Sequence, residues 1–515
     1  MIKTRASVAY LLVAAAMLLT PCVGMLWYRA NPEVQTSDLA TWPAAHNKDG
    51  SLNVEFLSEA GEYFSDHFAY RPELITLHAQ LQTGLLGVSP TDQVIFGTNG
   101  WLYYGGTLND FLGPEPISER ALFNEAHNLR LLQDKVQAAG ARFALVVVPN
   151  KNSVYPQQMP WWYQSSLVND PARLAQALTR AGVTFIDLYD PLRSGDAGPL
   201  YLQRDSHWNN RGALLAYQKI MGDLKLPALS LTPEEATART DHLGDLEALL
   251  FPTAVKPETN FYFDLPAYTY AVAGQDVETA ESATINPTGS KTLLMYRDSF
   301  ANALIPFLSA SFNQAYYSKL LPYDLSDLEL YRPDVVLVES AQRSMLNFSA
   351  NPPAFAAPVV PAQPLTQAQS VTSNTTITTT INGPYLVLSG LLDTEFVDAD
   401  TRVFVRISPP NGGGPEASVD EEEGQTAQTG SLSAETEKAA QLASVDEGDK
   451  REGVVVCEAF LTTSRVGPNA KATISDFGYQ AYLPLNWTLN NCRLDVIITT
   501  SQTSLVMQTL TYLGE

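Results

Sequence analysis

The chain of 515 residues is too long to fold around one hydrophobic core, so we expect two or three domains. Its 55 acidic and 32 basic side chains give a formal net charge of -23, and no stretch concentrates Lys and Arg. This balance argues against nucleic acid as a partner, because a polyanion is held by clustered cations.

The first 30 residues combine a basic start with an apolar run. Lys3 and Arg5 precede an almost uncharged segment from Val8 to Tyr28, and about 20 such residues span a bilayer. We predict that residues 1–30 are a single-pass membrane anchor with the remaining domains outside the cytoplasm. The alternative is a cleaved signal peptide, which would leave a secreted or periplasmic protein.

Residues 118–348 alternate between helical and strand patterns. A serine start, apolar residues at helical spacing and a glycine stop predict a helix over 118–140, and 142–149 has the composition of a buried strand. The same alternation continues at 171–182, 183–188, 209–224, 291–296, 299–312 and 333–340. Uniformly apolar strands joined by helices predict a parallel sheet covered on both faces, with ligands at the carboxyl ends of the strands. We assign this α/β domain to residues 31–350.

The C-terminal third has a different pattern. A Pro/Thr-rich stretch over 351–372 is typical of a linker, and short β-branched runs over 373–515 predict an antiparallel β-sandwich. Within it, the acidic segment 410–452 lacks periodicity and is predicted to be a disordered insertion. Cys457 and Cys492 would be able to pair in an oxidising compartment, and two buried thiols are an equal alternative.

The stretch "RDSHWNN" places Asp205 two residues before His207. In an extended backbone residues two apart point to one face, so the carboxylate would orient the imidazole as a general base. A metal pair and a purely structural pair are the alternatives. A metal needs a third and a fourth ligand, and the other histidines lie in no paired spacing, so we expect neither a metal nor a cofactor.

A second stretch, "KTLLMYRDSFANALIPFLSASF", runs from an apolar strand through Asp298 and Ser299 into a helical pattern. A serine at that point lies where free N–H groups can stabilise an oxyanion, as a nucleophile requires. Taken alone, Ser299 could be a simple helix N-cap. Together with Asp205 and His207 on the same predicted sheet edge, it indicates a Ser-His-Asp triad.

Seven segments in this order resemble the SGNH-hydrolase-like domain of the alginate O-acetyltransferase proteins and the related DHHW family. They are "SDHFAYRPELI", "VIFGTNGWLYY", "VVVPNKNSVYPQQMP", "RDSHWNNRGALLAY", "LGDLEALL", "YRDSFANALIPFL" and "RPDVVLVESAQRSM". The resemblance implies that Ser299 is the nucleophile, His207 the base and Asp205 the orienting acid. It also implies O-acetylation of a secreted or cell-wall polysaccharide, a carbohydrate-binding sandwich after the catalytic domain, and a membrane-bound O-acyltransferase as partner.

The chain departs from that family pattern at three points. Arg297 replaces the usual Gly before the Asp-Ser pair and would crowd the oxyanion site, and the first His of the DHHW motif is Ser206. The Asn that ordinary SGNH enzymes supply after "PDVV" is also missing. The oxyanion and substrate-binding candidates are Arg343, Gln342, Trp208, Asn150 and Lys151, with Trp208 either a lid over the pocket or part of the core.

The sequence therefore predicts an extracytoplasmic O-acetyltransferase or acetylesterase of the SGNH type, acting on a polysaccharide. The alternative is a non-catalytic glycan-binding or scaffold protein of a polysaccharide modification or export complex.

Overall fold

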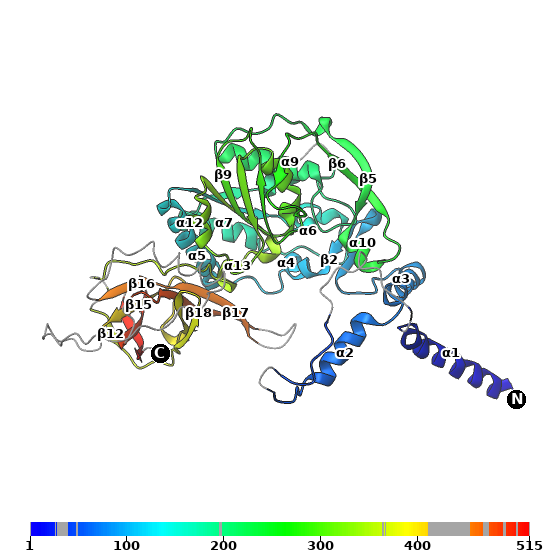
Figure 1. The fold of residues 1–515 in the computed structure, drawn as a ribbon, viewed down its shortest axis with the longest axis horizontal. Helices are drawn as coiled ribbons and strands as arrows, with labels where there is room; N and C mark the ends of the chain where they lie inside the picture. Colours follow the sequence, from blue (N-terminus) through cyan, green and yellow to red (C-terminus); the bar gives the residue numbers. More distant parts are fainter. Residues whose placement is uncertain are drawn as a thin grey trace, which may run out of the picture.

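The computed structural model describes residues 2–513 apart from 26, 28–39, 48–49, 195–197, 363–364, 366, 410–453, 467–472, 488–490 and 501–502. A helix-flanked sheet is followed by a β-sandwich (Figure 1). This is the predicted fold class, α/β followed by all-β. The predicted insertion at 410–452 lies outside the described residues.

Three helices precede the first sheet, namely α1 (Ile2–Gly24), α2 (Phe56–His67) and α3 (Arg71–Leu81), and a π-turn follows at Gln82–Leu86. No helix among the described residues combines the length and the apolar character that crossing a bilayer requires. The single-pass anchor over residues 1–30 stays a prediction.

The central sheet has seven strands in the order β4, β3, β11, β9, β10, β8, β7. Their bounds are Phe185–Asp187, Arg142–Val148, Val335–Ala341, Thr292–Tyr296, Gln314–Ser318, Glu281–Ile285 and Thr269–Tyr270. The first five are parallel, as predicted. At one edge β8 pairs antiparallel with β10, and β7 pairs antiparallel with β8. The prediction missed this edge because β8 alternates buried and less buried residues instead of forming the continuous apolar run of a central parallel strand.

Both faces of the sheet are buried, as alternate residues of β3 show. Ala144 and Val146 join one apolar cluster with α9 and α11, while Phe143 and Leu145 join a second cluster with α5 and α7. These helices are α5 (Glu119–Ala138), α7 (Asp170–Ala181), α9 (Asn210–Asp223) and α11 (Ile305–Ser309). The strand pattern therefore positions helices on both sides and leaves its carboxyl edge for the connecting loops.

Capping residues mark the first and last turns of these helices. The side chain of Ser118 accepts the Ala121 N–H at the start of α5, and Asn209 caps α9. Gly182 ends α7 with a φ of 71°, a left-handed conformation that suits glycine.

The remaining elements of this part of the chain are short. They are β1 (Val94–Phe96), η3 (Thr98–Gly100), β2 (Leu102–Tyr104), η4 (Gly105–Thr107), α4 (Leu108–Leu112), α6 (Lys151–Val154), η5 (Pro156–Gln158), α8 (Tyr189–Arg193), η6 (Pro233–Glu235), β5 (Thr237–Leu243), α10 (Asp245–Leu250), β6 (Pro257–Tyr262), η7 (Ser299–Ala303), α12 (Ser326–Tyr331), η8 (Gln342–Ser344) and α13 (Asn347–Ala350).

The sandwich packs a five-stranded sheet, β12-β20-β19-β15-β16, on a four-stranded sheet, β13-β14-β18-β17. The first consists of Gln369–Ser370, Ser504–Tyr512, Cys492–Thr499, Arg402–Ser408 and Val455–Glu458; the second of Thr378–Asn382, Tyr385–Leu391, Thr473–Pro484 and Phe460–Val466. A 3₁₀ turn, Thr394–Phe396, precedes β15. Apart from the short β12–β20 pair, the described pairs are antiparallel.

The two cysteines of the sandwich do not form the suggested disulfide. Cys457 and Cys492 are buried free thiols. Cys457 pairs with Val405 on β15, and Val405 pairs with Val496 on β19, four residues beyond Cys492. The thiols are therefore displaced both across and along the sheet, too far for an S–S bond. The buried-thiol alternative describes this structure.

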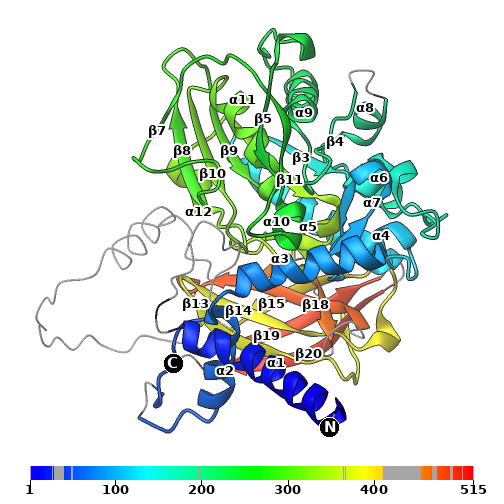
Figure 2. The same ribbon diagram turned by 90° about the vertical axis from the view of Figure 1, so that its right-hand side faces the viewer.

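Helix α5 lies between the central sheet and the sandwich (Figures 1 and 2). The Asn128 amide nitrogen donates to the carbonyls of Phe348 and Leu461, both at 2.8 Å, and its oxygen accepts the Leu461 N–H at 2.9 Å. Residues 351–362 run onto the sandwich, where Val360 N donates to the Val456 carbonyl. The two parts are thus joined by buried hydrogen bonds, and the predicted boundaries at 350 and 372 stay predictions.

Candidate functional site

The structure brings Ser299, His207 and Asp205 into contact at the carboxyl edge of the central sheet. His207 Nε2 lies 2.8 Å from Ser299 Oγ, and His207 Nδ1 lies 2.8 Å from Asp205 Oδ1. Asp205 is 4 % exposed. A hydroxyl, an imidazole and a buried carboxylate in this line can pass a proton from the serine to the histidine.

The turn after β9 leaves the Ser299 hydroxyl available. Asp298 is the N-cap: its Oδ1 accepts the Phe300 N–H at 2.8 Å and its Oδ2 accepts the Ala341 N–H at 2.7 Å. Because Asp298 caps the turn, Ser299 has no capping role. The following helix is short, however, with a 3₁₀ turn over Ser299–Ala303 before α11. Free N–H groups were predicted at this point, but the N–H of Phe300 is already bonded to Asp298.

Asp205 and His207 lie on a bend and not on the extended backbone that was predicted. Asp205 Oδ1 accepts the backbone N–H of His207 at 2.8 Å as well as its ring nitrogen. This side-chain-to-backbone bond folds the chain locally, as Asp often does. The two residues meet through the bend, and the predicted contact therefore forms for a different reason.

Of the two alternatives predicted for Trp208, a lid over the pocket or part of the core, the structure shows the second. Its indole is 1 % exposed, and Nε1 donates to the Phe300 carbonyl at 2.9 Å. This bond ties the His207 bend to the Ser299 turn.

Two further residues contact Asp205 and were not predicted. On β5, His242 Nε2 lies 2.9 Å from Asp205 Oδ2, and the backbone N–H of Asp245 donates to the same oxygen at 3.1 Å. Asp245 Oδ2 accepts the Ser206 hydroxyl at 2.5 Å and lies 3.6 Å from His207 Nδ1. Their only sequence signal is the short polar stretch "DHLGD", which has no paired spacing with His207.

The charges of this cluster shift its titrations. Burial alone would raise the pKa of Asp205, but the hydrogen bonds from His207 and His242 outweigh it and hold that pKa well below its usual range. Burial by itself would lower the pKa of both His207 and His242. The hydrogen bonds to Asp205 and its negative charge have the larger effect, so both pKa values are raised. For Asp245, burial and then the charge of Asp205 raise the pKa.

Asp205, His207 and Asp245 are also the group of described residues whose ligand atoms lie close enough to surround a metal ion, within 4.8 Å of one another. The 2.8 Å between His207 Nδ1 and Asp205 Oδ1 is a hydrogen-bond distance. Ligands on a tetrahedral ion with bonds of about 2.1 Å stand roughly 3.4 Å apart. The geometry therefore favours a proton between these atoms.

Three of the predicted substrate-binding residues support the loops around the site. Lys151 Nζ donates to the carbonyls of Leu102, Gln203 and Asp205 at 2.7–2.8 Å, and burial lowers the pKa of Lys151 to about 7. The backbone N–H of Asn150 donates to Gln342 Oε1 at 3.0 Å. Lys151 in particular has no donor left for a substrate, contrary to its prediction.

Arg343 lies beside the reacting groups. Its guanidinium is 5.2 Å from the centre of the Phe300 ring, and that ring lies 4.7 Å from the ring of His207. Within the described part of the chain Arg343 forms no hydrogen bond or ion pair. Arg297 differs: its guanidinium donates to Asn302 and to carbonyls of the loop before β8. Arg297 is therefore held by that loop, and the predicted crowding of the oxyanion site has no support.

Comparison with known proteins agrees with the resemblance seen in the sequence. Residues 94–300 match the family model described as "SGNH hydrolase-like domain, acetyltransferase AlgX". The chain is 28 % identical over 209 residues to a probable alginate O-acetylase AlgJ of Pseudomonas syringae pv. tomato. That alignment covers 39 % of this chain and 51 % of the relative. It is 29 % identical over 168 residues to the probable alginate O-acetylase AlgJ of Pseudomonas aeruginosa, which covers 30 % and 41 %.

The chain thus spans about half the length, or less, of these curated relatives. Among solved structures, the O-acetyltransferase domain of Pseudomonas putida AlgJ aligns with a TM-score of 0.35 at 20 % identity, over 49 % of this chain and 92 % of that one. Residues 94–300 thus match the SGNH hydrolase-like domain model, and the predicted family resemblance is confirmed.

Proposed function

We propose that this chain, whose residues 94–300 match the SGNH hydrolase-like domain model, is an O-acetyltransferase that modifies a polysaccharide. The observation that carries the proposal is the hydrogen-bonded line from Ser299 through His207 to Asp205. Matched relatives named as probable alginate O-acetylases support the reaction class.

In the first half-reaction Ser299 Oγ attacks the carbonyl carbon of an acetyl donor, and His207 Nε2 takes the hydroxyl proton. Asp205 stabilises the imidazolium that forms. When the tetrahedral intermediate collapses, the bond to the leaving group breaks and His207 returns the proton to it. An acetyl ester on Ser299 remains.

In the second half-reaction a sugar hydroxyl attacks that ester while His207 accepts its proton. The bond to Ser299 Oγ breaks, the serine regains the proton from His207, and the sugar leaves as its acetate. If water takes the place of the sugar, the same steps hydrolyse the ester. Transfer therefore exceeds hydrolysis when a sugar hydroxyl is bound close to Ser299.

Arg343 is the proposed oxyanion partner. The Phe300 N–H is committed to Asp298, whereas the Arg343 guanidinium has donors to spare and lies beside Phe300. A fixed positive charge next to a developing oxyanion is among the largest catalytic effects. Arg343 would thus take the part of the Asn that the chain lacks.

The proposed location is outside the cytoplasm, with residues 1–30 as anchor or signal segment. The proposed acetyl supply is a membrane-bound O-acyltransferase. Support for both comes from the basic and apolar N-terminus and from the resemblance to the polysaccharide acetylation families.

A fluorophosphonate probe tests whether Ser299 is a nucleophile. We expect covalent labelling of the wild-type protein at Ser299, hydrolysis of a chromogenic acetyl ester, and neither in Ser299→Ala. A folded wild-type protein that neither labels nor hydrolyses the ester would favour the alternative, a glycan-binding scaffold.

A further inference from the structure

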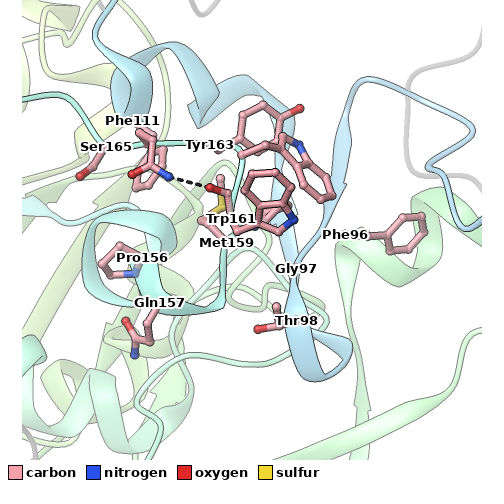
Figure 3. A pocket seen from close by; sticks show the side chains of 13 residues that line it. Phe96, Gly97, Thr98, Phe111, Pro156, Gln157, Met159, Trp161, Tyr163 and Ser165 are labelled. Atoms are coloured by element: carbon pink, nitrogen blue, oxygen red, sulfur yellow. Dashed lines mark hydrogen bonds between the residues drawn. The ribbon is translucent and has the colours of Figure 1, made fainter.

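A cavity lies apart from the Ser299 site, between η3 and the loop after η5 (Figure 3). It measures about 520 Å³ and is lined by 13 residues, none of which belongs to the Ser299–His207–Asp205 cluster. Its walls are mainly aromatic and thioether side chains, and its polar groups are neutral amides and hydroxyls: Trp161, Trp162, Tyr163, Met159, Gln157 and Thr98.

Two tryptophans of this cavity are unusually exposed. Trp161 is 80 % exposed and Trp162 is 61 % exposed. Their rings stand 5.8 Å apart at 83°, and Tyr163 continues the row 6.0 Å from Trp162. Large rings are normally buried because water contact is unfavourable for them, so neighbouring exposed indoles beside a cavity mark a binding surface.

The loop that carries these rings is held in place before any ligand binds. Gln158 Oε1 accepts the Thr98 hydroxyl at 2.5 Å and the Asn99 amide at 3.2 Å. Gly97 permits this contact, since a Cβ there would lie 2.4 Å from the Gln158 carbonyl oxygen. A fixed loop loses little conformational freedom on binding, which favours affinity.

The lining defines the chemistry of the ligand. No residue lining the cavity carries a charged side chain, and the whole chain has a formal charge of -23, which opposes an anion. A sugar ring presents a C–H face that packs on an aromatic ring and hydroxyls that bond to amides such as that of Gln157. We infer that this cavity binds an uncharged pyranose unit of the acceptor polysaccharide. A uronate, the unit of alginate, would bring a carboxylate for which the lining offers no cationic side chain.

The η3 turn, whose Thr98 lines the cavity, is linked to the proposed catalytic bend through its neighbour Asn99. The Asn99 carbonyl accepts Gln203 Nε2 at 2.5 Å, and Lys151 bonds the carbonyls of Gln203 and Asp205, both at 2.8 Å. The tryptophan loop also follows β3, which pairs with β11 next to β9. Cavity and Ser299 therefore share one edge of the sheet, and one polysaccharide chain can contact both. This assignment as an acceptor subsite rests on the proposed function.

Calorimetry on the full-length protein tests the inference with a neutral gluco- or manno-hexasaccharide and with a hexa-uronate. We expect the neutral sugar to bind and its Kd to rise about tenfold or more in Trp161→Ala and Trp162→Ala, the usual cost of truncating a central aromatic contact. Trp42→Ala is the matched control, because Trp42 is 57 % exposed and does not line the cavity. Fluorophosphonate labelling of Ser299 in Trp42→Ala should match that of the wild-type protein.

Several outcomes would overturn the inference: no binding across the neutral panel, tighter binding of the uronate, or equal weakening by Trp42→Ala. Binding to phosphatidylcholine–phosphatidylglycerol vesicles that is lost in Trp161→Ala, without sugar binding, would identify a membrane contact instead. Failure of the proposed function is distinguishable, because sugar binding would then persist in a wild-type protein that Ser299-directed probes do not label.

Discussion

His242 offers a test of how Asp205 works, and its replacement should change both the rate and the pH dependence of ester turnover. The Asp205 carboxylate accepts four hydrogen bonds, from His207 N, His207 Nδ1, His242 Nε2 and Asp245 N, at 2.8, 2.8, 2.9 and 3.1 Å. A hydrogen bond to a charged group contributes about 1.5–3 kcal/mol. His242→Ala removes one of the four and should therefore slow turnover by about 10- to 100-fold.

The pH dependence of turnover distinguishes an electrostatic role of His242 from a purely structural one. His242 competes with His207 for Asp205, and its pKa is raised, so at acidic pH it is a cation that opposes a charge on His207. Removing that cation should raise the pKa of His207 further. Because His207 must be neutral to accept the serine proton, the acidic limb of kcat/KM should move to higher pH. His242→Gln keeps an N–H donor and should recover most of the rate at alkaline pH while keeping the shifted limb.

The assay is hydrolysis of a chromogenic acetyl ester from pH 4.5 to 9, with melting temperatures measured alongside. His78→Ala is the control, since His78 is an exposed residue on α3 whose bond is to Gln82. A His242→Ala rate within about twofold of wild type, with an unmoved acidic limb, would show that Asp205 acts without His242. A uniform loss at every pH, in proportion to unfolded protein, would assign His242 a structural role only.

Ser299→Ala should reduce ester turnover by about 10³-fold or more with the melting temperature within a few degrees, and an unchanged rate would end the assignment of the nucleophile. Asp205→Asn should cost about 10⁴-fold with no effect of EDTA on the wild-type protein, whereas inactivation by EDTA and recovery with zinc would indicate a metal. Asp205→Asn should also lower the melting temperature more at pH 5.5 than at pH 8.5. The pKa of Asp205 is lowered and that of His207 is raised, so the ion pair is fully charged from about pH 4 to 6.5. The stability that the pair contributes is lost as the pH rises through the raised pKa of His207. Arg343→Ala should lower kcat by about 10²- to 10³-fold, and a change confined to KM would remove Arg343 from the oxyanion site. Lys151→Met should destabilise the fold by about 3–5 kcal/mol, because three carbonyls lose a buried donor, and denaturant unfolding that matches the wild type would contradict that role.

The sequence by itself determined what depends on local pattern. Ser118 and Gly182 mark helix ends because capping needs only neighbouring residues, and the apolar runs of β3 and β11 indicate buried parallel strands because every residue of such a strand is covered. Ser299 was found in the same way, as a polar residue directly after a buried strand. The carboxyl ends of parallel strands meet at one edge, so a nucleophile and a base near that edge could be expected to meet.

Only the tertiary structure decided which side chains complete the site. His242 and Asp245 reach Asp205 because β5 and the start of α10, which lies between the paired strands β5 and β6 in the chain, fold over the bend. No local spacing encodes that path. Trp208 and Lys151 look like site residues in the sequence, yet burial commits their donors to backbone carbonyls. The tryptophan cavity likewise forms where the loop after η5 packs on η3, about 60 positions earlier in the chain. Such contacts depend on the packing of distant segments, which a hydrophobic period along the chain does not specify.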